Sequence, residues 1–304
     1  RMTADYYRKK TTDLLNNVEM PRSSGYTTAL RNIGSIRNSG FELQLDGRII
    51  DRAVKWDLGV NFSLNRSKVL VLSEDKDIFG GELDNTILKD QLNLMRVGEP
   101  MYVFYGYVED GYDENGHIVY KNMDDDPAIT AADKTIIGDP NPDFLVNLTT
   151  AVSYKGFTLS AFFQSSIGND IYSLSMAAQA YDYGYNGNTL REVYYNHWTP
   201  ENPTAKYPNL DQTSYKMSDR FVYDGSFVRL KNLELAYDVP CARSKFIKRA
   251  RVYVSAQNLF TITSYPFWDP DINANGGGSS MIQGVDSYCY PSARTYTIGC
   301  RLTF

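Results

Sequence analysis

Histidine is scarce in this 304-residue sequence, and clustered cysteine and excess positive charge are missing from it. It has two histidines and three widely spaced cysteines (Cys241, Cys289 and Cys300), which excludes a histidine-rich metal site and a disulfide framework. The formal net charge of -5 provides no basic face for nucleic acid. No apolar run approaches the roughly 18 residues of a transmembrane helix.

Catalytic and nucleotide-binding motifs are also missing. Neither a GxGxxG pattern nor a P-loop occurs, and His197 has no acid and nucleophile close to it in the sequence. A polysaccharide-cleaving enzyme would need carboxylates positioned on strands, whereas most aspartates and glutamates here fall between the strand-like segments. The sequence therefore does not indicate an enzyme.

What the sequence does contain is aromatic residues and strict alternation. It has 24 Tyr, 14 Phe and 3 Trp, and in residues 54–65 every even position is apolar and every odd position is polar or glycine. Twelve alternating residues exceed the usual strand of about 5–6 and match the roughly 9–11 of a membrane-crossing strand. Similar alternation marks residues 41–46, 144–154, 157–163, 252–256 and 294–304.

Two further segments complete a set of eight strands. Residues 225–240 alternate, but the phase slips near Lys231–Asn232, which predicts a β-bulge. Residues 5–15 are charged on both faces, and we assign a strand there by analogy with the others.

The connections between these strands alternate in length. Links near 46–54, 154–157 and 237–251 are short, whereas those at about 17–39, 66–142, 167–225 and 263–292 are long. A compact soluble domain rarely carries several structureless loops above about 15 residues, but outer-membrane barrels combine short periplasmic turns with long extracellular loops. We therefore predict an all-β fold, a segment of a transmembrane antiparallel β-barrel in the outer membrane of a Gram-negative bacterium.

The alternative is a secreted or surface-anchored β-sandwich that binds glycans. A sandwich would turn its apolar faces into its own core and would need only about 5–6 residues per strand, so the long strands at 54–65 and 294–304 favour the barrel. Within the long loops, Asn115-Gly116 predicts a hairpin, and residues 173–198 predict helix interrupted by Gly184 and Gly187.

Several motifs, in order along the chain, resemble the SusC/RagA-type TonB-dependent transporters of the Bacteroidetes outer membrane. They are NIGSIRNSGFEL (32–43), TIIGDPNPDF (135–144), WTPENPTAKYP (198–208), DGSFVRLKNLELAYDVP (224–240), ARVYVSAQNLFTIT (250–263) and YPSARTYTIGCRLTF (290–304).

The resemblance implies a 22-stranded barrel with an internal plug, of which residues 1–304 would supply about the last eight strands. The plug and the segment that contacts TonB would then lie upstream of this chain. The family imports oligosaccharides, or peptides in some members, through the outer membrane together with a SusD-like surface lipoprotein. We expect no cofactor for this chain apart from a structural calcium ion.

An acidic stretch, NMDDDPAITAAD (122–133), has the spacing of a degenerate calcium loop. Asn122, Asp124, Asp126 and Asp133 would be its oxygen ligands, and the resemblance points to the same position. Pro127 stands where such a loop has its turn glycine, and the final ligand is Asp rather than Glu. The other interpretation is a vestigial acidic loop without metal.

Aromatic residues crowd the long loops, where they favour a surface for stacking sugar rings or a rim against a partner. The candidates that we select are Tyr105, Tyr183 and Trp198, together with the neighbouring pair Trp268 and Asp269, in which a planar ring beside a carboxylate suits a sugar contact. The alternative is that they form each loop's own small core.

The last segment ends on an aromatic residue. Tyr296, Ile298, Cys300 and Leu302 share one face, and Phe304 closes the chain. A terminal Phe after an alternating strand resembles the signal by which outer-membrane barrels are recognised for assembly. We therefore predict that residues 294–304 are the final barrel strand, that Phe304→Ala lowers the amount of assembled protein, and that the chain, which begins without Met, is a piece of a longer one.

Overall fold

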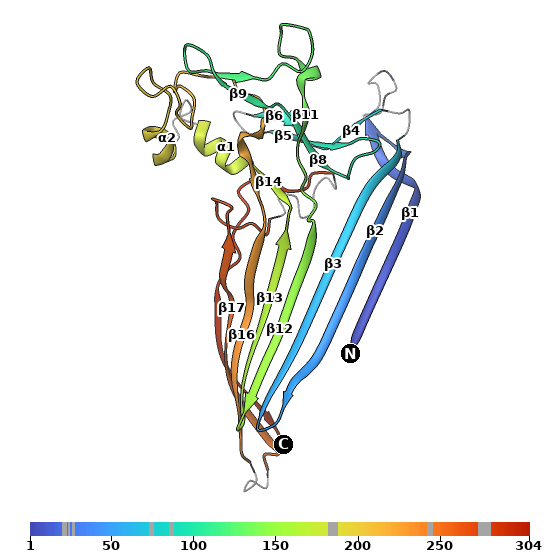
Figure 1. Cartoon of the computed structure of the whole chain (residues 1–304), viewed down its shortest axis with the longest axis vertical. Helices are drawn as coiled ribbons and strands as arrows, with labels where there is room; N and C mark the ends of the chain where they lie inside the picture. The colour runs from blue at the N-terminus through green and yellow to red at the C-terminus, as the bar shows by residue number, and fades with distance from the viewer. Residues whose placement is uncertain are drawn as a thin grey trace.

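Eight long strands form one continuous antiparallel sheet in the computed structural model (Figure 1). The structure describes the chain apart from residues 20–22, 24, 26–27, 73–75, 85–87, 182–187, 242–245 and 273–280. In spatial order the strands are β1 (Met2–Glu19), β2 (Thr28–Asp51), β3 (Val54–Leu72), β12 (Phe144–Tyr154), β13 (Phe157–Ile167), β16 (Phe227–Val239), β17 (Arg249–Thr263) and β19 (Thr295–Thr303).

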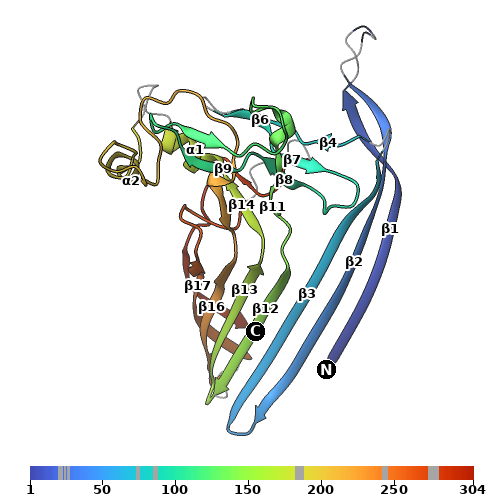
Figure 2. The same ribbon diagram turned by 45° about the horizontal axis from the view of Figure 1, so that its top comes forward.

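This sheet, called the strand wall below, confirms the predicted all-β antiparallel fold and excludes the β-sandwich. A sandwich needs two sheets packed face to face, whereas all eight long strands here belong to a single curved sheet (Figures 1 and 2). No helix in the described part of the chain is long and apolar enough to cross a membrane.

Short turns connect the strands at one end of the wall. The tightest is Lys155-Gly156 between β12 and β13, where both residues have positive φ (48° and 86°). Positive φ at both central residues is the conformation that matches the twist of a two-residue hairpin. At Gly156 a side chain would also press against Tyr237 and the carbonyl of Asp238.

Strands β1–β3 extend farther than their sequence pattern suggested. Most of the expected 17–39 loop is strand, since β1 continues to Glu19 and β2 begins at Thr28, and β3 runs to Leu72. These extensions lie beyond the alternating zone, and there Ile36, Val69 and Leu72 are buried against Met95 and Met281. Apolar residues of the extensions thus pack against the loop segments, so the alternation of the other zone is absent although the backbone pairing continues.

The bulge predicted near Lys231–Asn232 is confirmed. The register of β16 shifts between Leu230 and Asn232 against both of its neighbours, β13 and β17. Lys231 is the extra residue on β16 relative to β13, so the side-chain alternation reverses at this point.

The long loops fold into a separate layer over the opposite end of the wall (Figure 1). This loop layer contains β4 (Ile78–Phe79), β5 (Glu82–Asp84), β6 (Lys89–Gln91), β7 (Asn93–Met95), β8 (Val103–Gly106), β9 (Glu109–Tyr112), β10 (Ile118–Tyr120), η3 (Ala131–Asp133), β11 (Thr135–Gly138), β14 (Asp170–Ser173), α1 (Leu174–Tyr181), α2 (Arg191–Tyr195), η5 (Asp219–Phe221), β15 (Val222–Asp224) and β18 (Val285–Asp286).

Two local predictions within the loop layer are confirmed. β9 and β10 form the hairpin around Asn115-Gly116, with Gly116 at φ 79° and its N–H bonded to the carbonyl of Asp113 at 3.0 Å. Helices α1 and α2 lie within the predicted 173–198 segment, while Gly184 and Gly187 fall outside the described residues.

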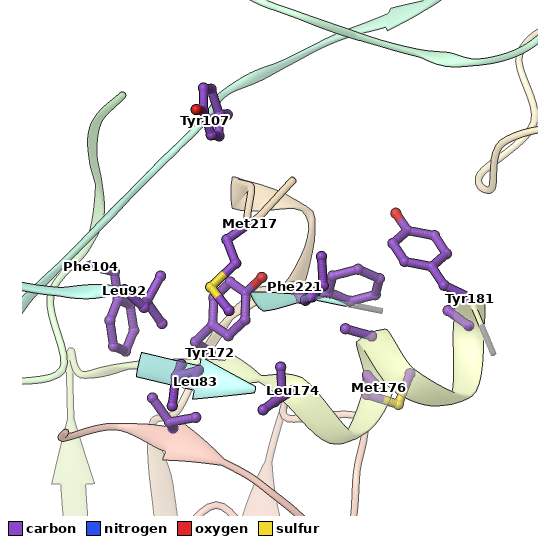
Figure 3. Packing of buried hydrophobic residues seen from close by; sticks show 14 of the residues in the cluster. Leu83, Leu92, Phe104, Tyr107, Tyr172, Leu174, Met176, Tyr181, Met217 and Phe221 are labelled. Carbon is purple, nitrogen blue, oxygen red and sulfur yellow. The ribbon is translucent and has the colours of Figure 1, made fainter. Parts of the chain in front are cut away.

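The loop layer has its own hydrophobic core (Figure 3). Its buried members come from distant parts of the chain and include Leu92, Phe104, Tyr172, Leu174, Met217 and Phe221. Phe104 meets Tyr172 edge-on, with the ring centroids 6.2 Å apart. Because Val285 also belongs to this core, segments from three long connections are fixed to one another, which gives the layer a defined surface.

Candidate functional site

The outward face of the strand wall is an apolar surface. Strand register aligns one residue from each of seven strands into a row: Ile50, Trp56, Val152, Leu159, Leu235, Val254 and Ile298. Ile298 is 84% exposed, and most of the others are exposed as well. A continuous exposed apolar face of this extent is typical of a surface that contacts lipid.

The inward face, one residue along each strand, is mainly polar. The adjacent row consists of Arg48, Asp57, Ala151, Ser160, Glu234, Ser255 and Thr297. Arg48 donates to Asp57 at 2.9 Å, and Arg251 lies 3.5 Å from Glu234. A wall that is apolar outside and polar inside is the arrangement of a barrel around an aqueous or protein-filled lumen.

A buried ion pair joins the loop layer to the inner face of the wall. Arg229 of β16 is only 1% exposed and forms an ion pair with Asp269, which is 7% exposed. The same guanidinium donates to the hydroxyls of Thr261 (2.9 Å) and Ser292 (3.0 Å) and to Asp271 (3.3 Å). Two ends of the last long connection are therefore held against β16 and β17.

The charge state of Asp269 is maintained by its partners. Burial alone would raise the pKa of its carboxyl, but the backbone N–H groups of Ser292 and Asp271 and the Arg229 guanidinium together lower that pKa below its ordinary value. The carboxylate is therefore ionised wherever the protein is folded near neutral pH.

A second buried carboxylate, Asp286 of β18, holds the same connection to α1. It accepts hydrogen bonds from the hydroxyls of Tyr265 (2.6 Å) and Ser175 (3.2 Å) and from the backbone N–H of Cys289 (3.1 Å). Burial and the hydrogen bond to Asp286 raise the pKa of the Tyr265 hydroxyl. No sequence motif singled out Asp286, because its partners are up to 111 positions away.

The β9–β10 hairpin is attached to the layer by another ion pair. Arg220 of η5 binds Glu109 of β9, and Glu109 also accepts from the Ser218 hydroxyl at 2.6 Å. Arg220 further donates to the Tyr112 hydroxyl at 3.1 Å. These contacts fix the hairpin relative to the segment that precedes β15.

The aromatic residues predicted to face a substrate have different surroundings. Tyr105 packs beside Phe79 (ring centroids 6.0 Å apart) and beneath the Arg96 guanidinium, 4.9 Å from its ring centre. Trp198 is half-buried against the hairpin turn, where its ring covers Gly116 so closely that a side chain would not fit there. Tyr183 falls outside the described residues.

Trp268 and Asp269, predicted as a pair, are separated by the fold. Trp268 is 57% exposed and stacks on Phe267, with ring centroids 4.7 Å apart. Asp269 as a sugar contact is wrong, because its carboxylate is buried and occupied by Arg229 and by two backbone N–H groups. Phe267 and Trp268 lie in a bend, and the sequence alone does not show which way the two neighbouring side chains point.

Several loop aromatics outside the selected set are exposed. Tyr194 and Tyr195 on α2 and Tyr288 and Tyr290 before β19 are all exposed. Sequence reasoning could not rank the loop aromatics, because burial depends on packing between distant segments.

The acidic stretch 122–133 is organised by hydrogen bonds to its own backbone. Asn122, Asp124 and Asp126 each accept from the N–H two residues ahead, at 2.8–3.1 Å. Asp133 accepts from the N–H groups of Met123 and Thr130, both at 2.7 Å, which lower the pKa of its carboxyl. No group of three or more His, Cys, Asp or Glu side chains suited to a metal occurs in the described part of the chain, and calcium binding at this loop stays a prediction.

The C-terminal residues lie at the edge of the strand wall. Tyr296, Ile298 and Leu302 of β19 pair with Ala256, Val254 and Ala250 of β17 and are exposed on the outward face. Phe304 follows the last paired residue and is also exposed. The role of Phe304 in assembly stays a prediction.

The chain belongs to a family of receptor β-barrels that depend on TonB. Residues 1–259 match the family model described as "TonB dependent receptor-like, beta-barrel", in agreement with a wall that is apolar outside and polar inside.

The particular relatives are of the SusC/RagA type. The chain is 32% identical to TonB-dependent receptor P3 of Formosa agariphila, covering 100% of this chain and 32% of the relative. It is 29% identical to TonB-dependent receptor SusC of Bacteroides thetaiotaomicron, covering 99% of this chain and 30% of SusC. The solved structure of the RagAB peptide transporter matches with a TM-score of 0.83 and 27% identity, over 100% of this chain and 33% of that one. The chain thus spans about a third of the length of these relatives.

Proposed function

We propose that this chain forms part of the wall and extracellular surface of an outer-membrane importer for oligosaccharides or peptides. The observation that supports it most is the pair of adjacent rows across the wall, one apolar and exposed and the other polar. Such a surface suits lipid outside and a solute pathway inside. On this proposal the protein resides in the outer membrane of a Gram-negative bacterium and does not act as an enzyme.

The two substrate classes are suggested by different relatives. RagAB is described as a peptide transporter, whereas the resemblance to SusC favours oligosaccharides. Exposed tyrosines at 194, 195, 288 and 290 could stack on sugar rings or line a rim against a partner protein. We propose that a SusD-like surface lipoprotein covers this loop layer and that TonB supplies energy through a part of the protein outside these residues.

Deletion of the gene in its source bacterium tests the proposal. We expect growth to fail on one glycan or peptide source and to recover with the gene supplied on a plasmid. Membrane fractionation should place the protein in the outer membrane, and affinity purification should recover a surface lipoprotein with it. Normal growth of the mutant on every such source, or recovery of the protein as a soluble monomer, would refute the proposal.

A further inference from the structure

A compact group of positive side chains lies on the outward face of β1–β3, towards the loop-layer end of these strands. We call it the cationic cluster; its members are Arg8, Lys10, Arg37, Arg66 and Lys68. The paired outward positions of β12, β13, β16, β17 and β19 hold no lysine or arginine. The cluster is thus local to one sector of the wall.

Three of these cations stand in direct register. Lys10 pairs with Arg37 on β2, and Arg37 pairs with Lys68 on β3, so they form one row across three strands. The row below it contains Arg8, Ser39 and Arg66. Like charges directly opposite each other on neighbouring strands are unfavourable, so this arrangement calls for an anion that bridges them.

The protein itself provides little of that negative charge. Arg66 forms an ion pair with Asp143 at 2.6 Å and also donates to the carbonyl of Pro142. It is the one member of the cluster that pairs with a carboxylate within the described residues. Arg8, Lys10 and Lys68 are exposed, and Arg37 is partly exposed.

The depth of the cluster is marked by aromatic residues directly beneath it. The next row on the same face is Tyr6, Phe41 and Leu64, and Phe62 occupies the row after that. Tyr6 is 74% exposed, and the Phe62 ring lies 6.3 Å from that of Phe41 and 5.8 Å from that of Phe144. Successive rows on one face are about 6.6–6.8 Å apart, and aromatic belts mark the boundary between hydrocarbon and headgroups. The cations therefore stand at headgroup height.

We infer that the cationic cluster binds the phosphate-bearing headgroup of a lipid in the outer leaflet. Apolar rows continue below the cluster on the same face, so one lipid could place its acyl chains on them and its phosphate between Lys10, Arg37 and Lys68. A free anion would use only the charges. The inference goes beyond import and uses only the membrane placement in the proposed function.

The test uses the protein purified from outer membranes in detergent, with lipid A as a phosphorylated glycolipid probe. Native mass spectrometry or thermophoresis should detect tighter binding of phosphorylated lipid A than of enzymatically dephosphorylated lipid A. In the variant Lys10→Gln/Arg37→Gln/Lys68→Gln we expect binding at least about tenfold weaker, since each cation near a membrane surface contributes appreciably to anion attraction. Added salt should reduce binding of the wild-type protein.

Two controls separate the cluster from general charge. The charge-preserving variant Lys10→Arg/Arg37→Lys/Lys68→Arg should bind like the wild type. The variant Lys9→Gln/Lys55→Gln/Arg301→Gln removes three inward cations and should do the same. Equal binding of both lipid forms, or unchanged binding in the first variant, would overturn the inference, as would binding of inorganic phosphate or an acidic peptide as tightly as lipid A. Outer-membrane recovery with normal uptake but no lipid preference would reject this inference alone, without touching import.

Discussion

The strand wall and the loop layer treat their apolar side chains in opposite ways. In the wall, Leu159, Leu235 and Ile298 face outward and are exposed, whereas in the loop layer Leu92, Phe104 and Tyr172 are fully buried. The wall requires lipid to cover it, but the loop layer carries its own core. Mutations of the same chemical type should therefore have different consequences in the two regions.

The largest expected effect comes from breaking the ion pair that connects the regions. Asp269→Ala leaves Arg229 buried without its main partner, which costs roughly 3–5 kcal/mol. Thermal unfolding in detergent should show the loss, and proteolysis should become faster in residues 264–292. Asp271→Ala removes a half-exposed carboxylate from the same guanidinium and should cost no more than about 1 kcal/mol; an equal effect of the two substitutions would contradict the role of burial.

Acid should reproduce part of that effect. Because the pKa of Asp269 is lowered in the folded protein, its contribution is complete above the ordinary pKa of 3.8 and is lost as pH falls through the lower folded value. The free energy of unfolding should therefore fall more steeply with decreasing pH, between about pH 5 and pH 2, for the wild type than for Asp269→Ala. Parallel curves would show that this carboxylate does not carry the acid sensitivity.

Shortening an apolar side chain should lower the stability of the protein when the residue lies in the loop core, but not when it lies on the outward face of the wall. Leu92→Ala removes a fully buried side chain from the loop core and should cost roughly 2–5 kcal/mol. Leu235→Ala shortens a side chain that is half-exposed on the outward face, so detergent or lipid fills the space. Comparison of the two melting temperatures tests this; equal losses would mean that Leu235 is covered by protein.

An added positive charge should be tolerated on the inward face of the wall but not on its outward face. Leu233 lies at the centre of β16 on the outward face, and its neighbour Asn232 faces inward. Leu233→Arg places a cation against the middle of the bilayer, at a cost of roughly 2–4 kcal/mol, and should lower the amount of assembled protein. Asn232→Arg should assemble normally, and failure of both variants would count against the assignment of the two faces.

Calcium should have the smallest effect. The proline at the turn position and the short final ligand in residues 122–133 weaken the site, so we expect a dissociation constant of about 10⁻³ M. Calcium at roughly ten times that concentration would then stabilise the protein by about 1.4 kcal/mol, and Asp124→Asn/Asp126→Asn would abolish the shift. No calcium-dependent change in wild-type melting would identify the loop as vestigial.

Alternation made the membrane-crossing part of the fold predictable. Where one face meets lipid, every second residue is apolar, so β12, β13 and the bulge at Lys231 could be located from the sequence. The ends of β1 and β2 beyond that zone lack this alternation and were predicted as loop.

The candidate site was less predictable for a different reason. The Asp269 side chain points inward, away from solvent, because it binds Arg229, which is 40 positions away in the sequence. Trp268 beside it is left exposed. The buried Asp286 depends in the same way on Tyr265 and α1. Polar networks that join distant loops leave no periodic pattern, so composition identified the aromatic and acidic residues but not their roles.

The bulge at Lys231 adds one residue to β16 and so changes which positions, odd or even, face outward. On one side of it Leu233 and Leu235 point outward, and on the other side Val228 and Leu230 do. If Lys231 were absent and residues 232–239 kept their pairing, the side chains of residues 227–230 would exchange faces, and Arg229 would point out of the barrel instead of into it. The extra residue therefore lets one strand serve two environments, hydrocarbon along its length and a charged attachment for the loops at its extracellular end.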